Sequence, residues 1–548
     1  MVPCENTIPK ELIPMGTTNT PQALTRRSFL ASGATVAALL GAGALTGCGS
    51  HRTSSSSGTA STLTYALNED PQALDPARVN DFGSLELCAN LYEGLFRFKG
   101  TTCDPEPCLA TSYDVSDDGL TYTFHLRKGV KFHDGTDFDA DAVVTNFERQ
   151  MDGKGAEDMG YAEMVFGTDQ TGTGVKSVTA KDSHTVVAVL RAACTPFVRN
   201  LAMALGTPIV SPTALKKHNG NLSTSPCGTG PYKLSSWEKG STVILKSFSD
   251  YWGTKPKVKS IVFRVMPESA DRVTALGNGE VDVITAIEKS SAPTVRKGGS
   301  TVKETDGLNT SYMVFNTASE KLKDASVRKA ICQAIDVDAI VSALFGKYAT
   351  VAHSLMPEFL APYDKDVSYP DYDPDAAKAT LSAAGVTELT CLTYTTAMQY
   401  NPAGGKSLAE SVQGYLDKVG VKLTVNAYDW TTFRSKRTEE YFDLAFAGWA
   451  GDNGDPDNFM SLFASGSNAT MSAYDDSEYK SLVAKGLATP DGDDRDDIYL
   501  QLEKKLTQDL PVLPISHAKT VCGYSPKVHG FAMHPTGWSK LVGVSKTA

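Results

Sequence analysis

Three carboxylates and three glycines share residues 448–459, which read Gly-Trp-Ala-Gly-Asp-Asn-Gly-Asp-Pro-Asp-Asn-Phe. An apolar run at 442–449 is typical of a buried strand, so the carboxylates fall at a strand end, where loops often carry binding groups. A fixed anion there suits a ligand that carries a cation. The alternative is a solvated turn, because Asp, Gly and Pro favour turns on their own account.

The elements that must position this stretch alternate between strands and helices. In the first half, the spacing of apolar residues predicts strands at 63–67, 120–126, 185–190 and 243–248, and helices at 84–96, 140–151 and 273–278. Asp139 is a candidate cap for the second of these helices. This alternation is typical of an α/β fold.

The second half repeats the alternation and surrounds the acidic stretch. Predicted strands are 312–316, 389–394, 422–427, 443–446 and 512–516, and predicted helices are 326–335, 338–345, 374–384, 406–419 and 495–509. Strands separated by helices imply a sheet with crossover connections. At 548 residues the chain is also too long for a single core, so we expect two or three domains.

The N-terminal segment predicts export. Residues 25–30, Thr-Arg-Arg-Ser-Phe-Leu, look like a twin-arginine motif, and the apolar run at 34–45 is short for a bilayer span. Residues 45–48, Leu-Thr-Gly-Cys, resemble a lipobox, which makes Cys48 the lipidated first residue of the mature chain. We therefore predict a signal peptide at 1–47 and a flexible tether at 48–61, with the protein outside the cytoplasm and held by acyl chains. An incidental cysteine after an ordinary signal peptide is the alternative.

Charge and motifs exclude several classes of function. A formal net charge of -11 with no basic cluster argues against a nucleic-acid partner. The sequence has no HExxH, GxSxG, Walker or full GxGxxG motif, so we predict neither an enzyme nor a cofactor. Paired carboxylates at 452–457 suit glycoside hydrolysis only weakly, because sequence neighbours seldom supply both the acid and the opposite-face base. The acidic stretch 491–497 lacks the spacing of a calcium-binding loop. It stands at the start of a predicted helix, where carboxylates interact favourably with the positive end of the helix macrodipole, so capping is favoured over calcium binding.

The cysteines do not reveal from sequence alone whether the protein contains disulfide bonds. Eight cysteines follow Cys48, and their connectivity cannot be read from sequence. Cys103 and Cys108, close together around two prolines, are the one specific candidate pair. A structural role is favoured over zinc binding, because no CxxC pair or His-rich cluster accompanies them.

A long motif in the first half of the chain resembles the signature of a known protein family. Residues 118–135, Asp-Gly-Leu-Thr-Tyr-Thr-Phe-His-Leu-Arg-Lys-Gly-Val-Lys-Phe-His-Asp-Gly, followed by 140–144, resemble the signature of the family 5 extracellular solute-binding proteins of ABC importers. Further matches occur in the expected order at 228–232, 251–253, 327–330 and 372–374. The resemblance spans the mature chain from about residue 63 to the end, and residues 448–459 look most like the dipeptide-binding branch.

This resemblance implies an architecture. The family fold is a two-lobe periplasmic-binding-protein fold of type II, cluster C, with an extra subdomain in lobe I and lobes that close on the ligand. Mapped onto this chain, lobe I with its subdomain is 62–308, lobe II is 309–515, and 516–548 returns to lobe I.

The resemblance also implies a binding site. Asp452 occupies the position that pairs with the α-ammonium of a bound peptide, and Trp430 and Tyr400 match aromatic positions near the peptide, with lobe packing as the alternative for both. Gly448 and Trp449 belong to the same wall, and Asp455 and Asp457 are interpreted as turn formers.

The chain departs from the family at one position. Where the dipeptide binders hold the ligand's carboxylate with an arginine before Tyr-Asn-Pro, this sequence has Met398, and a thioether cannot make that bidentate contact. Arg434, Lys406 or Lys436 are candidate substitutes. Alternatively, the ligand is longer or lacks a free carboxylate.

The function implied is capture of di- or oligopeptides outside the cytoplasm by a monomeric lipoprotein, which delivers them to the permease and ATPase of an ABC importer. The alternatives are another solute on the same scaffold, such as a nickel chelate or haem, a hydrolase, or a purely adhesive lipoprotein. Nickel calls for imidazole ligands, and no histidine falls beside Asp452 or Tyr400 in the sequence.

Overall fold

We describe a computed structural model, in which residues 61–151, 159–167 and 174–548 are placed. The twin-arginine motif, Cys48 and the tether of the sequence prediction lie outside these residues. All of the placed residues belong to one compact unit. In the part of the chain that is placed, no helix combines the length and apolar character needed to cross a membrane. We keep the names lobe I for 62–308 and lobe II for 309–515.

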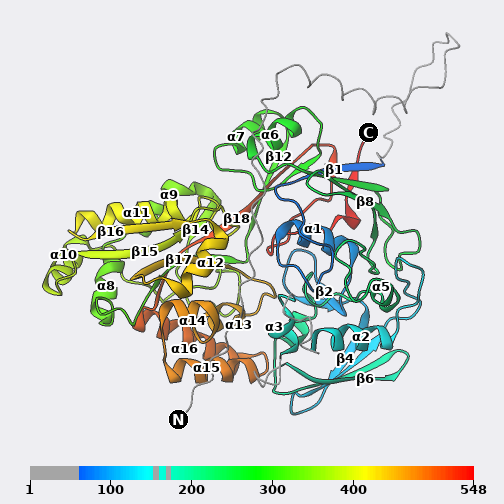
Figure 1. Cartoon of the computed structure of the whole chain (residues 1–548), viewed down its shortest axis with the longest axis horizontal. Coiled ribbons are helices and arrows are strands. Elements are labelled where there is room, and N and C mark those ends of the chain that lie inside the picture. Colours follow the sequence, from blue (N-terminus) through cyan, green and yellow to red (C-terminus); the bar gives the residue numbers. More distant parts are fainter. Residues whose placement is uncertain (1–60, 152–158, 168–173) are drawn as a thin grey trace, which may run out of the picture. The chain divides into compact units, whose positions relative to one another are not determined.

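Lobe II is built on a sheet that is covered on both faces (Figure 1). The order is β16-β15-β17-β13-β18, with β15 parallel to β16 and β17, and β13 antiparallel to β17 and β18. Its elements are β13 (Asn309–Phe315), α8 (Ala325–Gln333), α9 (Val337–Leu344), η2 (Gly346–Tyr348), β14 (Ala349–Val351), α10 (Pro374–Ala383), β15 (Glu388–Tyr394), α11 (Gly405–Lys418), β16 (Lys422–Tyr428), α12 (Trp430–Glu439), β17 (Leu444–Ala450), α13 (Asp457–Met460), η3 (Ser461–Phe463), α14 (Gly466–Ser472), α15 (Ser477–Ala488), α16 (Asp493–Asp509) and β18 (Val512–Tyr524).

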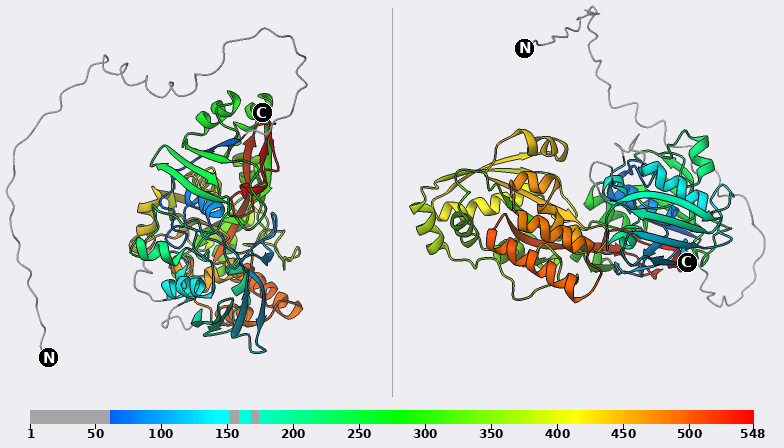
Figure 2. Two further views of the ribbon diagram at one scale, coloured as in Figure 1. Left: turned by 90° about the vertical axis from the view of Figure 1, so that its right-hand side faces the viewer. Right: turned by 90° about the horizontal axis from the view of Figure 1, so that it is seen from below.

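Alternation along β13 explains the two cores of lobe II. Met313 and Phe315 belong to the core beneath α8–α11, whereas Tyr312 and Val314 belong to the core beneath α12–α16. Because successive strand residues point to opposite faces, residues 312–315 of β13 fill both cores, whereas its first half is made of the buried polar residues Asn309, Thr310 and Ser311. Figure 2 shows α14–α16 (orange) along one side of this sheet.

Lobe I contains two larger sheets. In one, β1 pairs in parallel with β10 and β11, and β9 and β8 extend it; in the other, four antiparallel strands run β4-β5-β7-β6 and pack against α2. The elements are β1 (Thr62–Leu67), α1 (Phe82–Leu91), β2 (Phe96–Phe98), β3 (Pro105–Pro107), β4 (Ala110–Val115), β5 (Thr121–Leu126), α2 (Ala140–Met151), α3 (Ala162–Phe166), β6 (Val175–Asp182), β7 (Thr185–Leu190), α4 (Phe197–Asn200), α5 (Pro212–Lys217), β8 (Tyr232–Glu238), β9 (Thr242–Ser247), β10 (Ser260–Val265), α6 (Ser269–Gly277), β11 (Val283–Ile284), α7 (Ala292–Lys297) and β12 (Thr301–Asp306).

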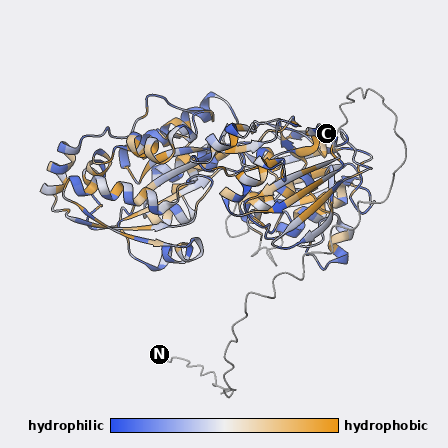
Figure 3. Ribbon diagram, turned by 90° about the horizontal axis from the view of Figure 1, so that it is seen from above, coloured by the Kyte–Doolittle hydropathy of each residue, from blue (hydrophilic) through white to orange (hydrophobic). Residues whose placement is uncertain are grey.

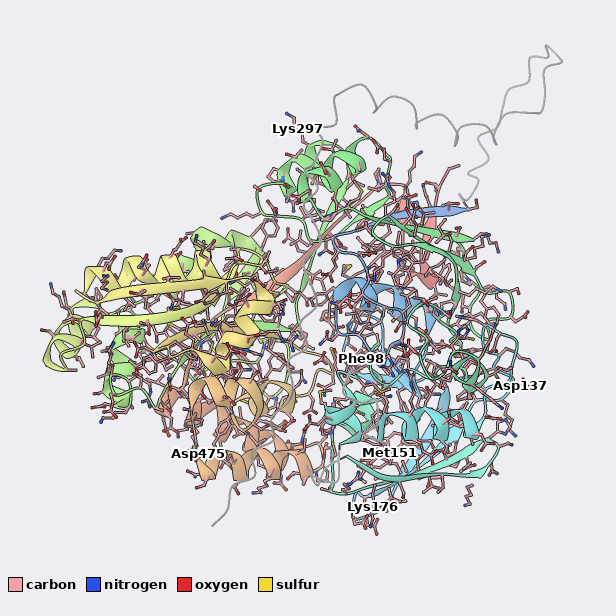
Figure 4. The ribbon with its side chains drawn as sticks, viewed as in Figure 1. Phe98, Asp137, Met151, Lys176, Lys297 and Asp475 are labelled. Atoms are coloured by element: carbon pink, nitrogen blue, oxygen red, sulfur yellow. The ribbon has the colours of Figure 1, made fainter. Side chains whose placement is uncertain are left out.

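One strand, β18, joins the sheets of the two lobes. Its first residues pair with β13, and residues 519–524 pair with β12 and β11. The boundary predicted at 515/516 therefore falls inside a continuous strand. The chain then ends with β19 (Val528–His529), η4 (Leu541–Gly543) and β20 (Ser545–Lys546). His534 in this tail stacks on Phe98, which is labelled in Figure 4, with ring centroids 5.2 Å apart.

The α/β two-lobe prediction is confirmed, and several element limits change. Asp139 accepts a hydrogen bond from the amide of Ala142 at 3.0 Å, so the predicted cap is present. Helix α1 ends at Leu91, five residues before the prediction, because the chain turns into β2 at Phe96. In Figure 3 the helices carry both hydrophobic (orange) and hydrophilic (blue) residues, as expected of helices with one buried face.

The candidate pairing of Cys103 with Cys108 is wrong. All eight cysteines in the placed residues are free thiols. The side chain of Cys103 is instead directed toward the other lobe, where it packs against Gly454. Cys108 is buried at the end of β3 in the lobe I core.

Candidate functional site

Loop 451–458, which follows β17, carries the acidic residues, and close contacts explain its glycines. Gly454 has φ +69, and a Cβ there would lie 2.0 Å from the Cβ of Cys103 in lobe I. A Cβ at Gly451 would lie 2.7 Å from Cγ of Leu308. Any side chain at either position would therefore push the loop away from its neighbours, so the glycines let lobe II meet lobe I at short range.

Asp452 sits where the two lobes meet. Its Oδ1 accepts a hydrogen bond of 2.8 Å from the hydroxyl of Tyr161, which precedes α3 in lobe I. The Oδ1 of Asn458 accepts hydrogen bonds from the Asp452 amide and from Nε1 of Trp449, both at 3.0 Å, and so fixes the loop behind it. Burial raises the pKa of Asp452 to about 6, although the bonds from Tyr161 and Asn458 lower it.

Among the described residues, no cationic side chain accompanies this carboxylate. Across 61–151, 159–167 and 174–548, Asp452 takes part in no ion pair within 4.0 Å. An ionised carboxylate without a counter-ion is costly to bury. Asp452 can therefore hold a proton near its pKa or accept a cation from outside the protein.

Asp455, three residues further on, has the opposite environment. It is fully buried and forms a two-pronged ion pair with Arg495 of α16, with Nη2···Oδ1 at 2.7 Å and Nη1···Oδ2 at 3.0 Å. Its Oδ1 also accepts the amide of Asp457 at 3.0 Å. Asp455 thus forms the turn, as expected, and in addition anchors the loop to α16.

Aromatic residues form one wall behind the loop. Tyr400 is buried with its ring against Gly448, where a Cβ would lie 2.1 Å from Cδ2 of the ring. Trp430 begins α12, and its ring meets Tyr394 edge-on at 5.6 Å. Tyr400, Trp430, Trp449 and Met398 all pack into the core beneath α12–α16. The structure therefore brings together the predicted site residues, and packing accounts for much of the contact made by Tyr400 and Trp430.

The three candidate substitutes for an arginine at position 398 are engaged elsewhere or exposed. Lys406 pairs with Glu410 at 3.7 Å and Lys436 with Glu439 at 3.7 Å, each on its own helix, and Arg434 is exposed. Met398 itself closes a tight turn, with reciprocal backbone bonds of 3.0 Å to Asn401. Nothing in these contacts favours one of the three as a carboxylate ligand.

Lobe I residues at the site were missed from the sequence. Besides Tyr161, Asn200 accepts a bond of 2.6 Å from Nδ2 of Asn453, and Arg199 donates to Asp491 at 2.8 Å. These residues lie more than 250 positions from their partners and belong to no motif. Only a signal linking distant positions, such as covariation among homologues, could have found them.

Comparison with known proteins finds relatives that this chain matches over most of their length. The model of the bacterial extracellular solute-binding proteins, family 5 Middle, matches residues 104–471. The dipeptide-binding protein of Escherichia coli (strain K12) is 31% identical over 89% of this chain and 95% of its own length. Heme-binding protein A of Haemophilus influenzae is 29% identical over 90% of this chain and 94% of its own.

A solved structure shows the same fold. The periplasmic binding protein DppA of Helicobacter pylori, in complex with the peptide STSA, is 30% identical to this chain. It superposes with a TM-score of 0.77 and covers 89% of this chain and 99% of its own.

Proposed function

Because this chain belongs to the bacterial extracellular solute-binding proteins of family 5, we propose that it captures short peptides outside the cytoplasm and hands them to the membrane subunits of an ABC importer. Relatives named as dipeptide-binding proteins support a peptide ligand, and so does a related structure solved in complex with a four-residue peptide. Lobe closure places the ligand between the loop 451–458 and lobe I.

The observation that carries this proposal is the unpaired carboxylate of Asp452. It lies at the junction of the lobes, bonded to Tyr161 and without a cation within 4.0 Å in the described residues. A peptide's α-ammonium supplies the missing charge, and a charge-assisted hydrogen bond forms in a site that excludes water. Removing one partner of a buried ion pair costs about 3 to 5 kcal/mol, so a peptide without this ammonium should bind two to three orders of magnitude more weakly.

Haem is the second candidate, because Heme-binding protein A is among the relatives. Haem carries propionate groups, which are anions, so Asp452 would repel them rather than bind them. In the described residues no group of three or more His, Cys, Asp or Glu is placed to hold a metal ion. The charge at Asp452 therefore favours the peptide.

Two measurements test the peptide assignment. Mass spectrometry of small molecules released on denaturing the purified protein should recover peptides, and recovery of non-peptide solutes alone would overturn the assignment. Calorimetry with one peptide and its N-acetylated form should show the acetylated form binding at least about 100-fold more weakly. Equal affinities would remove Asp452 from its proposed role.

Membrane attachment through Cys48 after twin-arginine export is also part of the proposal, supported by the sequence motifs at 25–48. In a Cys48→Ala protein we expect loss of acylation and of membrane association in fractionated cells. Unchanged membrane association would contradict a lipid anchor at this residue.

A further inference from the structure

A cavity of about 140 Å³ lies beside the proposed ammonium site. Its apolar walls come from both lobes: Met164, Val165, Leu190 and Phe197 belong to lobe I, and Leu487 belongs to lobe II. A cavity of about 150 Å³ with apolar walls accommodates benzene, so this space suits a group of the size of an amino-acid side chain.

The cavity continues directly from the surroundings of Asp452. Helix α3, which supplies Met164 and Val165, begins immediately after Tyr161, the residue bonded to Asp452. On the lobe II side, Asn458 lines the cavity and accepts the Asp452 amide at 3.0 Å. In an α-amino acid the ammonium and the side chain leave the same carbon. A ligand whose ammonium meets Asp452 therefore has its first side chain next to this space.

One polar group in the cavity lacks a partner. Asp457, at the start of α13, lines the cavity, and its Oδ1 is fully buried without a hydrogen-bond partner in the described residues. Burial first, and then the neighbouring Asp455, raise the pKa of this carboxyl to about 7. Arg495 and hydrogen bonds with Tyr499 and Ser461 lower this pKa, but Arg495 is already engaged by Asp455 and Asp491. The lining thus combines these apolar side chains with the polar residues Asn200, Asn453, Asn458 and Ser461. It also carries one carboxyl oxygen, Oδ1 of Asp457, that has no hydrogen bond within the described residues.

We propose that this cavity receives the side chain of the ligand's first residue, and that Asp457 selects a side chain with an aliphatic stem and a cationic end, as in lysine. The stem would pack on Met164, Val165 and Phe197, and the ammonium would pair with the Asp457 carboxylate. This inference rests on the proposed peptide ligand and adds a preference at its first position.

Calorimetry with three dipeptides tests the inference on the unaltered protein. Lysyl-alanine, norleucyl-alanine and alanyl-alanine share the α-ammonium; the first two differ only at the end of the side chain. We expect lysyl-alanine to bind at least about tenfold more tightly than norleucyl-alanine, because hydrogen bonds to charged groups contribute about 1.5 to 3 kcal/mol. Norleucyl-alanine should bind more tightly than alanyl-alanine, since its stem fills the apolar part of the cavity.

An Asp457→Asn variant removes the negative charge and keeps the shape of the cavity nearly unchanged, so it tests the role of the carboxylate alone. In this protein the preference for lysine over norleucine should fall below about threefold, while the affinity for alanyl-alanine stays unchanged. Asp494→Asn, at an exposed aspartate of α16, is the matched control and should keep the full preference.

The outcomes distinguish a failure of this inference from a failure of the proposed peptide-binding function on which it rests. If no dipeptide binds, the peptide assignment itself fails. If dipeptides bind but lysine and norleucine are equivalent in the unaltered protein, or the preference survives in Asp457→Asn, the role of Asp457 is refuted and the peptide assignment stands.

Discussion

Asp452 and Asp455 are three residues apart in one loop, yet they have opposite environments. Asp455 is fully buried against Arg495, with two contacts of 2.7 and 3.0 Å. Asp452 accepts the Tyr161 hydroxyl at 2.8 Å and has no cation within 4.0 Å among the described residues, and its pKa is raised to about 6, chiefly by burial. A carboxylate that is satisfied inside the protein holds the fold together, and one that is left unsatisfied is available to a ligand.

The largest effect should come from breaking the satisfied pair. Arg495→Ala removes the two-pronged partner of the buried Asp455 and leaves the more distant Arg199, whose Nη1 lies 3.7 Å from Oδ2. The free energy of unfolding should therefore fall by up to about 3 to 5 kcal/mol, measured by urea denaturation. The control is Arg296→Ala, which removes an arginine that pairs with Glu304 at 2.9 Å but is 40% exposed. Surface pairs contribute at most about 1 kcal/mol, so equal losses in the two variants would contradict the contrast.

Removing the unsatisfied carboxylate should affect binding instead of stability. In Asp452→Asn we expect peptide affinity to fall about 100- to 1,000-fold in calorimetry, because the ligand's ammonium loses its partner. The unfolding free energy should stay equal or rise, since an unpaired buried charge is lost. A variant that unfolds more readily but binds peptide normally would make Asp452 a structural residue like Asp455.

Protonation is a second way to remove the negative charge of Asp452. Its pKa is raised from 3.8 to about 6, so the carboxylate that an ammonium needs is present above pH 6 and is lost below it. Peptide affinity should therefore fall about tenfold between pH 7 and pH 5 in calorimetry, and Asp452→Asn should remove this dependence.

Stability should respond to pH with the opposite sign. The folded, ligand-free protein favours protonated Asp452, so this group's contribution to stability is present below its unfolded pKa and declines as pH rises through about 6. Comparing the unfolding free energies of the unaltered protein and Asp452→Asn across that range isolates the contribution. An affinity that is independent of pH from 5 to 7 would contradict the raised pKa.

The smallest effect should come from the lobe I hydroxyl. Tyr161→Phe removes the bond to Asp452 without changing the ring, and a single hydrogen bond to a charged group contributes about 1.5 to 3 kcal/mol at most. Because the ammonium remains as the main partner, we expect peptide affinity to fall only about three- to tenfold. A loss as large as that of Asp452→Asn would show that Tyr161, rather than the carboxylate, governs binding.

Local elements could be read from the chain because their signals are local. The period of apolar residues placed the strand at 185–190 at its observed limits, and Asp139 caps α2 as predicted. The end of α1 was missed because the chain turns into β2 shortly after it. The length of β18 was missed because distant strands determine it: β18 continues to Tyr524 by pairing with β11 and β12.

The sequence by itself determined the α/β alternation, the family resemblance and the acidic loop after a buried strand, since each depends on residue types at short spacing. Only the tertiary structure decided which carboxylate of that loop is neutralised. Arg495 lies 40 residues from Asp455, and Tyr161 lies 291 residues from Asp452. The energy of a charge depends on the groups within a few ångströms of it, and folding, not sequence order, places those groups.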